Sequence, residues 1–345
     1  MHHFRIKFFT PSLFLSLIAG AILAILGCQP NEGKKSGTAN QANNNSHAPA
    51  KSAVQVPSFN ADSTFEYINK QVSFGPRVPG SKGHKACGDW LTQQFAIFTD
   101  TVLTQKATVK SATNESFPMR NIIASTNPNL SQRILLCAHW DTRREADQDT
   151  KRHNEPILGA NDGGSGVGVL LEIARQLKAK PLKTIGVDFV LFDVEDQGKS
   201  DIENSYCLGA TYWSSNPHIP GYKAQYGILF DMVGAGDAVF LREGNSMQYA
   251  AHIVNKVWNT AAEIGYNHYF ENRNTYPITD DHVAVNKILQ IPTIDIIQYD
   301  PEGFKHGFGD FWHTHNDDMG IISKPTLKAV GQTVLTVLYR QDEPV

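Results

Sequence analysis

From Arg133 to the end of the chain, apolar runs typical of strands alternate with segments whose apolar residues recur at helical spacing. "RILLCAHWD" and "TIGVDFVLFDVE" are two such runs, and the segment between them has its apolar residues at Val169, Leu170, Ile173 and Leu177. A last helix is expected after Ser323, which is a suitable N-cap. This alternation predicts a single α/β domain with a mostly parallel central sheet and helices on both faces.

In sheets of this class, ligands bind at the carboxyl ends of the strands. Acids and histidines follow several of the predicted strands at these ends, and the turn before the predicted helix that contains Val169 adds another acid. These residues are His139, Asp141, Asp162, Asp193, Glu195, Asp196 and Asp231. Carboxylates crowded together repel one another, and a bound cation removes that repulsion. The sequence therefore predicts one polar, cation-binding site at this edge of the sheet.

A histidine and two carboxylates make a three-ligand zinc site with an open fourth position, which is the catalytic arrangement. Asp162 lies in the glycine-rich turn "GANDGGSGVG", which lacks the Lys and Ser/Thr of a phosphate-binding loop. Glu195 and Asp196 are neighbours, so their side chains diverge; one can hold a metal while the other works as an acid or base. "GFGDFWHTHNDD" adds His313.

Each of these features also has an ordinary explanation. Adjacent acids are most often part of a solvated loop, and His139 with Asp141 alone would be a surface pair. Trp312 either packs beside His313 or donates its indole N–H into the pocket. Only the convergence of several such residues at one sheet edge favours a functional site.

The first 27 residues combine a basic start with an apolar run ending in "ILGC", which predicts a lipoprotein signal peptide with Cys28 as the lipidated residue. An uncleaved membrane anchor is the alternative. Residues 28–56 have the composition of a disordered linker, which leaves 57–345 as the catalytic domain. We expect a periplasmic, lipid-anchored protein, and Gln29 favours the outer membrane.

The folded part contains an odd number of cysteines, so it can form at most one disulfide. These cysteines are Cys87, Cys137 and Cys207, and the apolar run around Cys137 predicts a buried thiol. The net charge is −3, with 19% charged residues. This composition gives no basic excess for nucleic-acid binding.

Five motifs in order resemble the zinc-dependent aminopeptidase superfamily, and within it the bacterial zinc-containing glutaminyl cyclases. They are "FGPRVPGSKGH", "HWDTR", "GANDGGSGVGVLLEIAR", "DVEDQG" and "WHT", and the likeness runs from Phe65 to Tyr339. The resemblance implies one zinc ion per chain. It also implies the site residues: Asp162, Asp196 and His313 as zinc ligands, Glu195 as general acid/base, Asp231 and Asp280 as its hydrogen-bonded carboxylate partners, and Trp312 with Glu195 as substrate-binding residues.

Two details favour the cyclases over the peptidases. Asp280 in "TDDHVAV" stands where aminopeptidases more often have Ser, and the tryptophan and acidic pair of "FWHTHNDD" are similar to those of cyclases. Animal cyclases have a histidine where this chain has Asp295. Peptidases of the superfamily that bind two metal ions use five ligand positions. In this chain, His139 and Asp231 together with Asp162, Asp196 and His313 would correspond to all five, so the sequence leaves the binding of a second zinc ion undecided.

The resemblance implies an enzyme that converts the N-terminal glutamine of peptides and proteins to pyroglutamate and releases ammonia. Its expected partners are such peptides, and the chain is expected to be a monomer. The alternative is a zinc aminopeptidase in which Glu195 activates water instead. A third alternative, a non-catalytic lipoprotein that binds peptide or metal, does not explain why Glu195 accompanies a full ligand set.

Overall fold

The computed structural model describes residues 54–342. The predicted signal peptide, Cys28 and nearly all of the predicted linker lie outside these residues. Val54 and Val56 pack against the core, so the described fold includes residues just before the predicted start at Pro57. Within the described part of the chain, no helix has both the length and the apolar character needed to cross a membrane.

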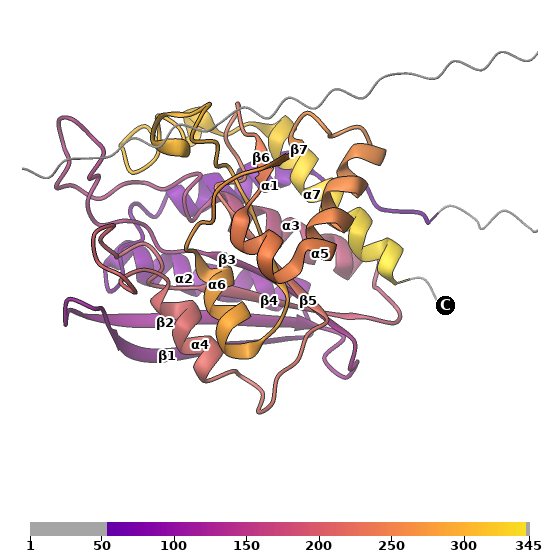
Figure 1. The fold of residues 1–345 in the computed structure, drawn as a ribbon. Coiled ribbons are helices and arrows are strands. Elements are labelled where there is room, and N and C mark those ends of the chain that lie inside the picture. The colour runs from indigo at the N-terminus through magenta and orange to yellow at the C-terminus, as the bar shows by residue number, and fades with distance from the viewer. Residues whose placement is uncertain (1–53, 343–345) are drawn as a thin grey trace, which may run out of the picture. The chain divides into compact units, whose positions relative to one another are not determined.

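The centre of the fold is a six-stranded sheet with the order β1-β2-β4-β3-β5-β8. Strands β4, β3, β5 and β8 are parallel, whereas β2 is antiparallel to β4 and β1 is antiparallel to β2 (Figure 1). The strands are β1 (Thr101–Lys110), β2 (Ser116–Thr126), β3 (Arg133–His139), β4 (Gly186–Phe192), β5 (Tyr226–Asp231) and β8 (Thr293–Ile297). A separate pair joins β6 (Phe240–Arg242) to β7 (Phe270–Asn274).

Alternate residues of the buried strands enter two different cores, as the two-residue period of a strand requires. Ile134 and Leu136 belong to the larger core, whereas Leu135 and Cys137 belong to a smaller one. The larger core is covered by α1 (Ala61–Val72), α2 (Lys82–Phe98), α3 (Ser165–Ala179), α5 (Gly244–Glu263) and α7 (Lys324–Gln341). The predicted α/β domain, with a mostly parallel sheet and helices on both faces, is confirmed.

The smaller core is covered by α4 (Leu208–Ser215) and by the π-helix η1 (Val285–Leu289), which continues α6 (Asp281–Ala284). These segments contact each other on one side of the sheet. The predicted N-cap of the last helix is also present, because the Ser323 hydroxyl accepts a hydrogen bond from the Thr326 N–H.

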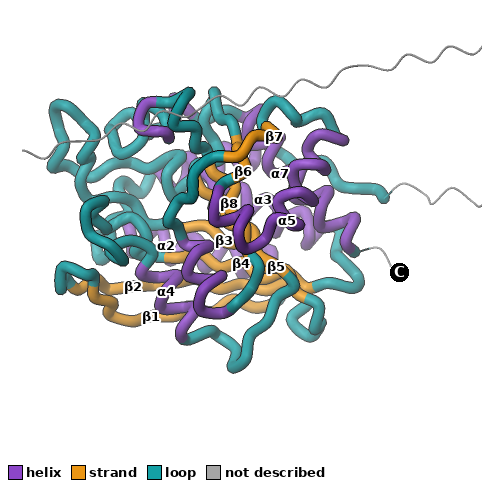
Figure 2. The backbone as a smooth tube through the Cα atoms, in the orientation of Figure 1, coloured by secondary structure: helices purple, strands orange, loops and turns teal. Residues whose placement is uncertain are grey.

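No pattern in the sequence predicted the hairpin β1–β2, which lies at one edge of the sheet (Figure 2). Most of β1 is exposed or half-buried, so its sequence carries polar residues on both faces and lacks the apolar run of an inner strand. The hairpin explains why the sheet is not wholly parallel.

Some of the residues with left-handed backbone lie where the strands and loops reach the polar edge of the sheet. Val194, Met232 and His313 have φ values of +56°, +47° and +54°. Left-handed backbone is unusual for residues other than glycine, and most unusual for a β-branched residue such as valine. Such positions persist only where the surrounding structure fixes them, and they occur often at functional sites.

Candidate metal centre and active site

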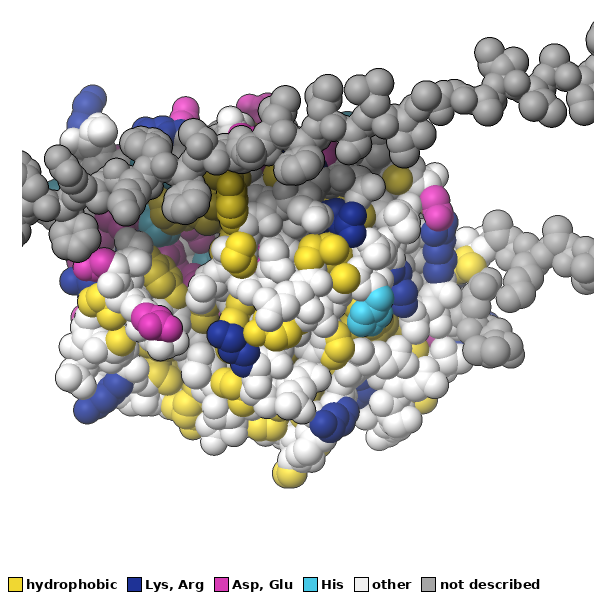
Figure 3. Space-filling model, in the orientation of Figure 1, with side chains coloured by type: hydrophobic (Ala, Val, Ile, Leu, Met, Phe, Trp, Pro, Cys, Tyr) yellow, Lys and Arg dark blue, Asp and Glu magenta, His cyan; other side chains and the backbone are white. Residues whose placement is uncertain are grey.

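The three predicted zinc ligands lie together at the carboxyl edge of the sheet. His313 Nε2 is 3.4 Å from Asp196 Oδ1 and 3.9 Å from Asp162 Oδ2, and all three side chains are buried. Ligand atoms around a tetrahedral zinc ion lie roughly 3.4 Å apart. Acidic and histidine side chains are also visible in a hollow bordered by hydrophobic side chains (Figure 3).

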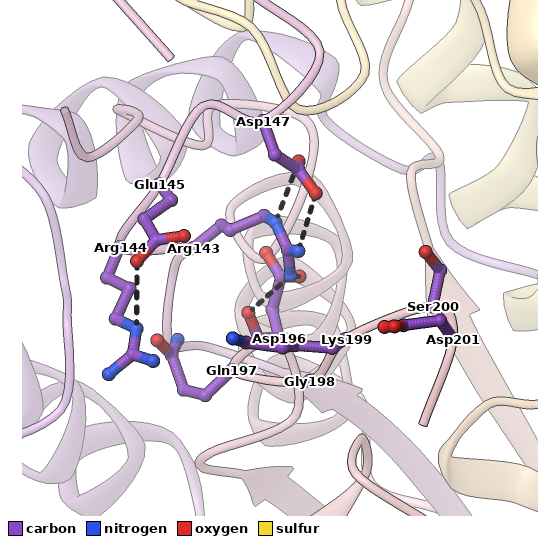
Figure 4. A pocket seen from close by; sticks show the side chains of 10 residues that line it. All are labelled: Arg143, Arg144, Glu145, Asp147, Asp196, Gln197, Gly198, Lys199, Ser200 and Asp201. Carbon is purple, nitrogen blue, oxygen red and sulfur yellow. Dashed lines mark hydrogen bonds and ion pairs between the residues drawn. The ribbon is translucent and has the colours of Figure 1, made fainter. Parts of the chain in front are cut away.

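His313 and Asp196 are held by a pair of residues that the sequence did not reveal. Asp147 Oδ1 lies 2.8 Å from His313 Nδ1, and the Arg143 guanidinium donates two hydrogen bonds to the Asp147 carboxylate. Arg143 also donates to Asp196 Oδ1 at 3.2 Å (Figure 4). A carboxylate on the far nitrogen of a ligand histidine fixes its ring and tautomer.

The contacts of Asp147 with His313 and Arg143 also change the pKa of its carboxyl group. Burial alone would raise the pKa of Asp147, but its hydrogen bonds with His313 and Arg143 hold that pKa well below its usual range. Both residues follow His139 and Asp141 in the loop "HWDTRREAD". The one available signal was the "HWDTR" motif, which contains Arg143 but does not say what it contacts.

Asp162 is positioned through its backbone. Asp317 accepts hydrogen bonds from the N–H groups of Asn161 and Asp162, at 2.7 and 3.0 Å. Gly163 has a φ of +85°, and a Cβ there would lie 2.3 Å from the Asp141 carbonyl oxygen. The glycine is therefore required for the turn that brings the Asp162 carboxylate into the site.

The donor set fits a zinc ion. Asp196 Oδ2 is buried and has no hydrogen-bond partner among residues 54–342. Burial, and then the charge of Asp162, raise the pKa of Asp196. A divalent cation between these two carboxylates and His313 would relieve both the repulsion and the unpaired oxygen.

Glu195 makes different contacts from its neighbour Asp196 and lies close to Cys207 and Asp280. The Cys207 thiol donates to Glu195 Oε1 at 3.3 Å, and ligand-type atoms of Glu195, Cys207 and Asp280 lie within 4.8 Å of one another. Asp141 accepts hydrogen bonds from the N–H groups of Glu195 and Asp196, which orients the two neighbours. The predicted divergence of the pair is present in the structure.

The surroundings of Glu195 favour its protonated form. Burial raises the pKa of Glu195 well above its ordinary value; His139 acts in the opposite direction, and the charges of Asp280 and Asp196 add to the increase. A carboxyl group with a raised pKa accepts a proton more readily than an ordinary carboxylate and can donate it again in a later step. This is the property that a general acid/base requires.

Asp231 lies against His139, whose Nε2 is 3.1 Å from Asp231 Oδ1 and 3.0 Å from Asp162 Oδ1. These three residues form a second group of possible ligands that shares Asp162 with the first. Burial raises the pKa of Asp231 to about 7, although His139 acts to lower it. The role of Asp231 as a hydrogen-bonded partner of Glu195 stays a prediction.

Asp193 does not belong to the site, contrary to the expectation that every acid after a strand would line it. Its carboxylate lies 3.0 Å from His84 Nε2 and accepts a hydrogen bond from the Arg120 N–H. Side chains at the end of a strand alternate between the two faces, so Asp193 faces the hairpin side instead. His84 in turn stacks on Trp140, with ring centroids 4.3 Å apart.

The remaining predicted residues lie in or beside the site. The Trp312 ring stacks on His313, with centroids 3.8 Å apart, so packing is its observed role and substrate binding stays a prediction. His315, two residues after His313, pairs with a different acid: its Nδ1 lies 2.9 Å from Asp149 Oδ2. Asp295, at the position where animal cyclases have a histidine, is buried, and His282 Nδ1 lies 3.9 Å from its carboxylate.

One further motif residue shapes the site from behind. Arg77 of "FGPRVPG" is fully buried and donates hydrogen bonds to the carbonyl oxygens of Trp140, Leu158 and Gly159. It thereby ties the loop after β3 to the turn that precedes Asp162. The sequence identified this motif by resemblance but gave Arg77 no role.

The cysteines of the described chain are all free and buried. Cys87 and Cys137 lie in the two cores, whereas Cys207 contacts Glu195. The predicted buried thiol at Cys137 is confirmed, but no pattern in the sequence predicted the contact of Cys207 with Glu195.

Residues 121–338 match peptidase family M28. The chain belongs to this family. The resemblance to the zinc aminopeptidase superfamily is thereby confirmed, and the chain is an enzyme of that superfamily. The match covers the predicted ligands Asp162, Asp196 and His313 together with Glu195 and Asp280, but not the "FGPRVPG" motif or β1.

Solved structures of the family include both cyclases and peptidases. Porphyromonas gingivalis glutaminyl cyclase is 51% identical and has a TM-score of 0.80, covering 82% of this chain and 99% of that chain. A zinc-dependent exopeptidase from Parabacteroides distasonis is 48% identical, also with a TM-score of 0.80, covering 83% of this chain and 99% of that one. These similarities support a zinc-binding enzyme of the cyclase and exopeptidase type.

A more distant relative is Aminopeptidase YwaD of Bacillus subtilis, which is 27% identical over 79% of this chain. The matched region is 55% of that relative's length, so the chain spans about half of it.

Proposed function

We propose that the chain is a glutaminyl-peptide cyclotransferase, which converts the N-terminal glutamine of peptides and proteins to pyroglutamate with release of ammonia. The proposal includes one zinc ion per chain, held by Asp162, Asp196 and His313. When bound there, zinc supplies Lewis-acid polarisation of the glutamine side-chain carbonyl. The chain's own residues orient the substrate and move the protons.

Glu195 carries the proton transfers in this mechanism. The α-amine of the substrate attacks the γ-carbonyl carbon of its own side chain, and Glu195 accepts the proton that the amine loses. Glu195 then returns a proton to the side-chain nitrogen, the carbon–nitrogen bond breaks, and ammonia leaves behind a five-membered ring. Asp280 beside Glu195 raises its affinity for the proton between the two steps.

The observation that carries the proposal is that Glu195 and Asp280 lie in one group of buried side chains, while Asp196, the next residue after Glu195, belongs to the group of predicted zinc ligands. Asp280 stands where peptidases of the superfamily more often have serine, and the similarity to a named glutaminyl cyclase agrees with this reading. A zinc aminopeptidase is the second candidate, because an exopeptidase is nearly as similar.

Mass spectrometry of two incubations tests the proposal. A peptide that begins with glutamine should lose the mass of ammonia, whereas the same peptide beginning with leucine should stay intact. Release of free leucine or free glutamine at a comparable rate would identify the chain as an aminopeptidase instead.

The number of zinc ions is tested separately. His139→Ala removes the histidine of the second ligand group without touching Asp196 or His313. The wild type should bind one zinc per chain, and the variant should bind the same amount. Two zinc ions in the wild type and one in the variant would contradict the proposal.

We also propose that the chain is a monomeric lipoprotein, anchored through Cys28 to the periplasmic face of the outer membrane. The support is the "ILGC" sequence and the linker-like composition that follows it. Mass spectrometry of the mature N-terminus should find an acylated cysteine, and Cys28→Ser should release the protein from membranes. A mature N-terminus elsewhere on a soluble protein would contradict this.

A further inference from the structure

His84 and Asp193 form a buried pair that has no role in the proposed mechanism so far. His84 Nε2 lies 3.0 Å from each oxygen of the Asp193 carboxylate. The side chain of Asp193 is fully buried, and that of His84 is 7% exposed. His84 is the last residue of the motif "FGPRVPGSKGH", and Asp193 is the first residue of "DVEDQG". Two of the motifs in the sequence therefore meet in this pair.

The His84 ring is held in one orientation. The Gly80 N–H donates a hydrogen bond to His84 Nδ1 at 3.4 Å. Because Nδ1 accepts this hydrogen bond, the ring carries a proton on Nε2 and donates it to Asp193. The ring also stacks on Trp140 at an interplanar angle of 17°, and the Trp140 indole N–H donates to the carbonyl oxygen of Arg120. The donor that faces Asp193 is therefore fixed in place.

Asp193 holds the turn that leads from β4 into the site. Its Oδ1 accepts a hydrogen bond from the Val194 N–H at 2.9 Å, and its Oδ2 accepts one from the Arg120 N–H at 2.6 Å. Val194 has a φ of +56°, which a β-branched residue rarely adopts. Such a conformation persists only where surrounding contacts enforce it. The Asp193 carboxylate is one of these contacts, and the residue after Val194 is Glu195.

The Glu195 carboxylate has weaker side-chain support than that of its neighbour Asp196. Arg143 donates to Asp196 Oδ1, whereas Glu195 Oε1 accepts from the Cys207 thiol, which is a weak donor. The main chain of Glu195 is held more firmly. Its N–H donates to Asp141 Oδ1 at 3.0 Å, and its carbonyl oxygen accepts from the Cys207 N–H at 3.0 Å. The direction of the Glu195 side chain therefore depends on the backbone that leads into it.

Resting on the proposed function, in which Glu195 is the general acid/base, we propose that His84 and Asp193 are positioning residues for Glu195. His84 fixes the Asp193 carboxylate, and this carboxylate holds Val194 in its left-handed conformation. A general acid/base must lie within hydrogen-bond reach of the proton that it moves. Displacing a reacting group by about 1 Å can lower the rate by about 10²-fold. Loss of the pair should therefore lower kcat and leave zinc binding in place.

Two substitutions of His84 differ in the contact with Asp193. In His84→Gln, the amide nitrogen can take the place of Nε2 and still donate to Asp193. In His84→Asn, the side chain is one methylene shorter and its amide lies near the former Nδ1, so this donor is lost. For a peptide that begins with glutamine, kcat of His84→Asn should fall by about 10²-fold and KM should change much less. The kcat of His84→Gln should stay close to the wild-type value.

Bound zinc should stay at one per chain in both variants. Arg143 donates to the Asp196 carboxylate, and Asp141 accepts from the Asp196 N–H, so the ligand has support that does not pass through His84. The matched control is His218→Asn. His218 also stacks on a tryptophan, Trp213, at an interplanar angle of 18°, and its hydrogen bond is to that tryptophan. This control should keep both its zinc and its kcat.

A double-mutant cycle with Val194→Gly separates positioning from general packing. Glycine adopts left-handed backbone without strain, so the turn needs less support from Asp193 in this background. His84→Asn should therefore lower kcat much less in Val194→Gly than in the wild-type chain. If His84 acted only through packing, the loss would be the same in both backgrounds, because independent effects add.

Four results would overturn the positioning role: an unchanged kcat in His84→Asn, an equal loss in His84→Gln, a loss of zinc that parallels the loss of kcat, or additive losses in the cycle. If His84→Asn does not fold, Asp193→Asn decides. It replaces one acceptor oxygen with an amide nitrogen, so kcat should fall while zinc is retained, and an unchanged kcat would again overturn the role.

The proposed function fails separately, if the wild type releases no ammonia from the glutamine peptide. The same variants are then assayed for release of the free N-terminal residue, because Glu195 would also move the proton in an aminopeptidase. A loss of kcat in His84→Asn that His84→Gln avoids would support the positioning role in that reaction too, and equal rates in both variants and the wild type would overturn it.

Discussion

The ligand side of the site and the carboxylate side beyond Glu195 are adjacent but are held in different ways. On the ligand side (Asp162, Asp196 and His313), named partners fix the residues. Asp317 holds the backbone of Asp162, Asp147 holds the His313 ring, and Arg143 contacts Asp196. Such support is what a metal ion needs, because its ligands must keep their geometry.

The carboxylate side (Asp280, Asp281 and Asp295) has buried acids with less support. Both carboxylate oxygens of Asp281 lack a hydrogen-bond partner within the part of the chain that the structure describes. Burial, and then the charge of Asp280, raise the pKa of Asp281 well above its ordinary value. The ligand side therefore has the fixed geometry that metal binding requires, whereas burial and mutual repulsion on the other side favour protonated carboxyl groups near Glu195.

Loss of a ligand should have the largest effect. His313→Ala removes the nitrogen ligand, so bound zinc should fall well below one per chain and cyclisation should fall to background. Metal analysis and an ammonia assay check this. His315→Ala, two residues away and paired with Asp149, is the matched control and should keep its zinc. Unchanged zinc and full activity in His313→Ala would remove it from the ligand set.

Glu195→Gln should reduce activity without reducing zinc binding, and so distinguish the carboxylate side from the ligand side. The change keeps the shape of the side chain and removes the titrating group, so zinc content should stay at the wild-type level. Activity should fall by about 10²–10⁴-fold, the usual contribution of general acid–base catalysis. Asp196→Ala should instead lose zinc and activity together. A Glu195→Gln enzyme with near-normal cyclisation would exclude Glu195 from the mechanism.

Asp147→Asn should weaken the ligand side without removing a ligand. Partners of this kind typically contribute 10–100-fold in metal affinity, so the zinc dissociation constant should rise by about that factor. Titration against a chelator measures it. Asp149→Asn is the control, since Asp149 contacts His315 and not His313. An equal effect of both changes would mean that Asp147 acts only through folding.

The smallest effect is expected on the carboxylate side. Because the pKa of Asp281 is raised, the folded chain keeps a proton there that the unfolded chain releases above about pH 4. Extra protons bound in the folded state make its stability fall as pH rises. Asp281→Asn removes the titrating group and with it this loss of stability. The free energy of unfolding of the variant minus that of the wild type should therefore increase from pH 4 to pH 7.

Urea unfolding at both pH values checks this, with the exposed Asp237→Asn as control. A constant difference from the wild type would mean that Asp281 is ionised in the folded chain.

The inner strands and their helices could be predicted because their signal is local. The apolar runs at β3, β4, β5 and β8 and the helical spacing in α3 are properties of short segments. The edge strand β1 of the hairpin lacks such a signal, since an edge strand with half-buried faces tolerates polar residues throughout. The pairing of β2 with β4 depends on packing between distant segments.

The types of the site residues and the places where the inner strands end could be read from the sequence, because both are properties of short segments. From them we predicted that Asp162, Asp196, His313 and Glu195 lie at one edge of a sheet. The contacts that each side chain makes at that edge are seen only in the folded chain. Asp193 turned to His84, which is 109 residues away, and Asp147 reached His313 across 166 residues. Contacts between distant segments depend on side-chain direction and packing, which no local pattern records.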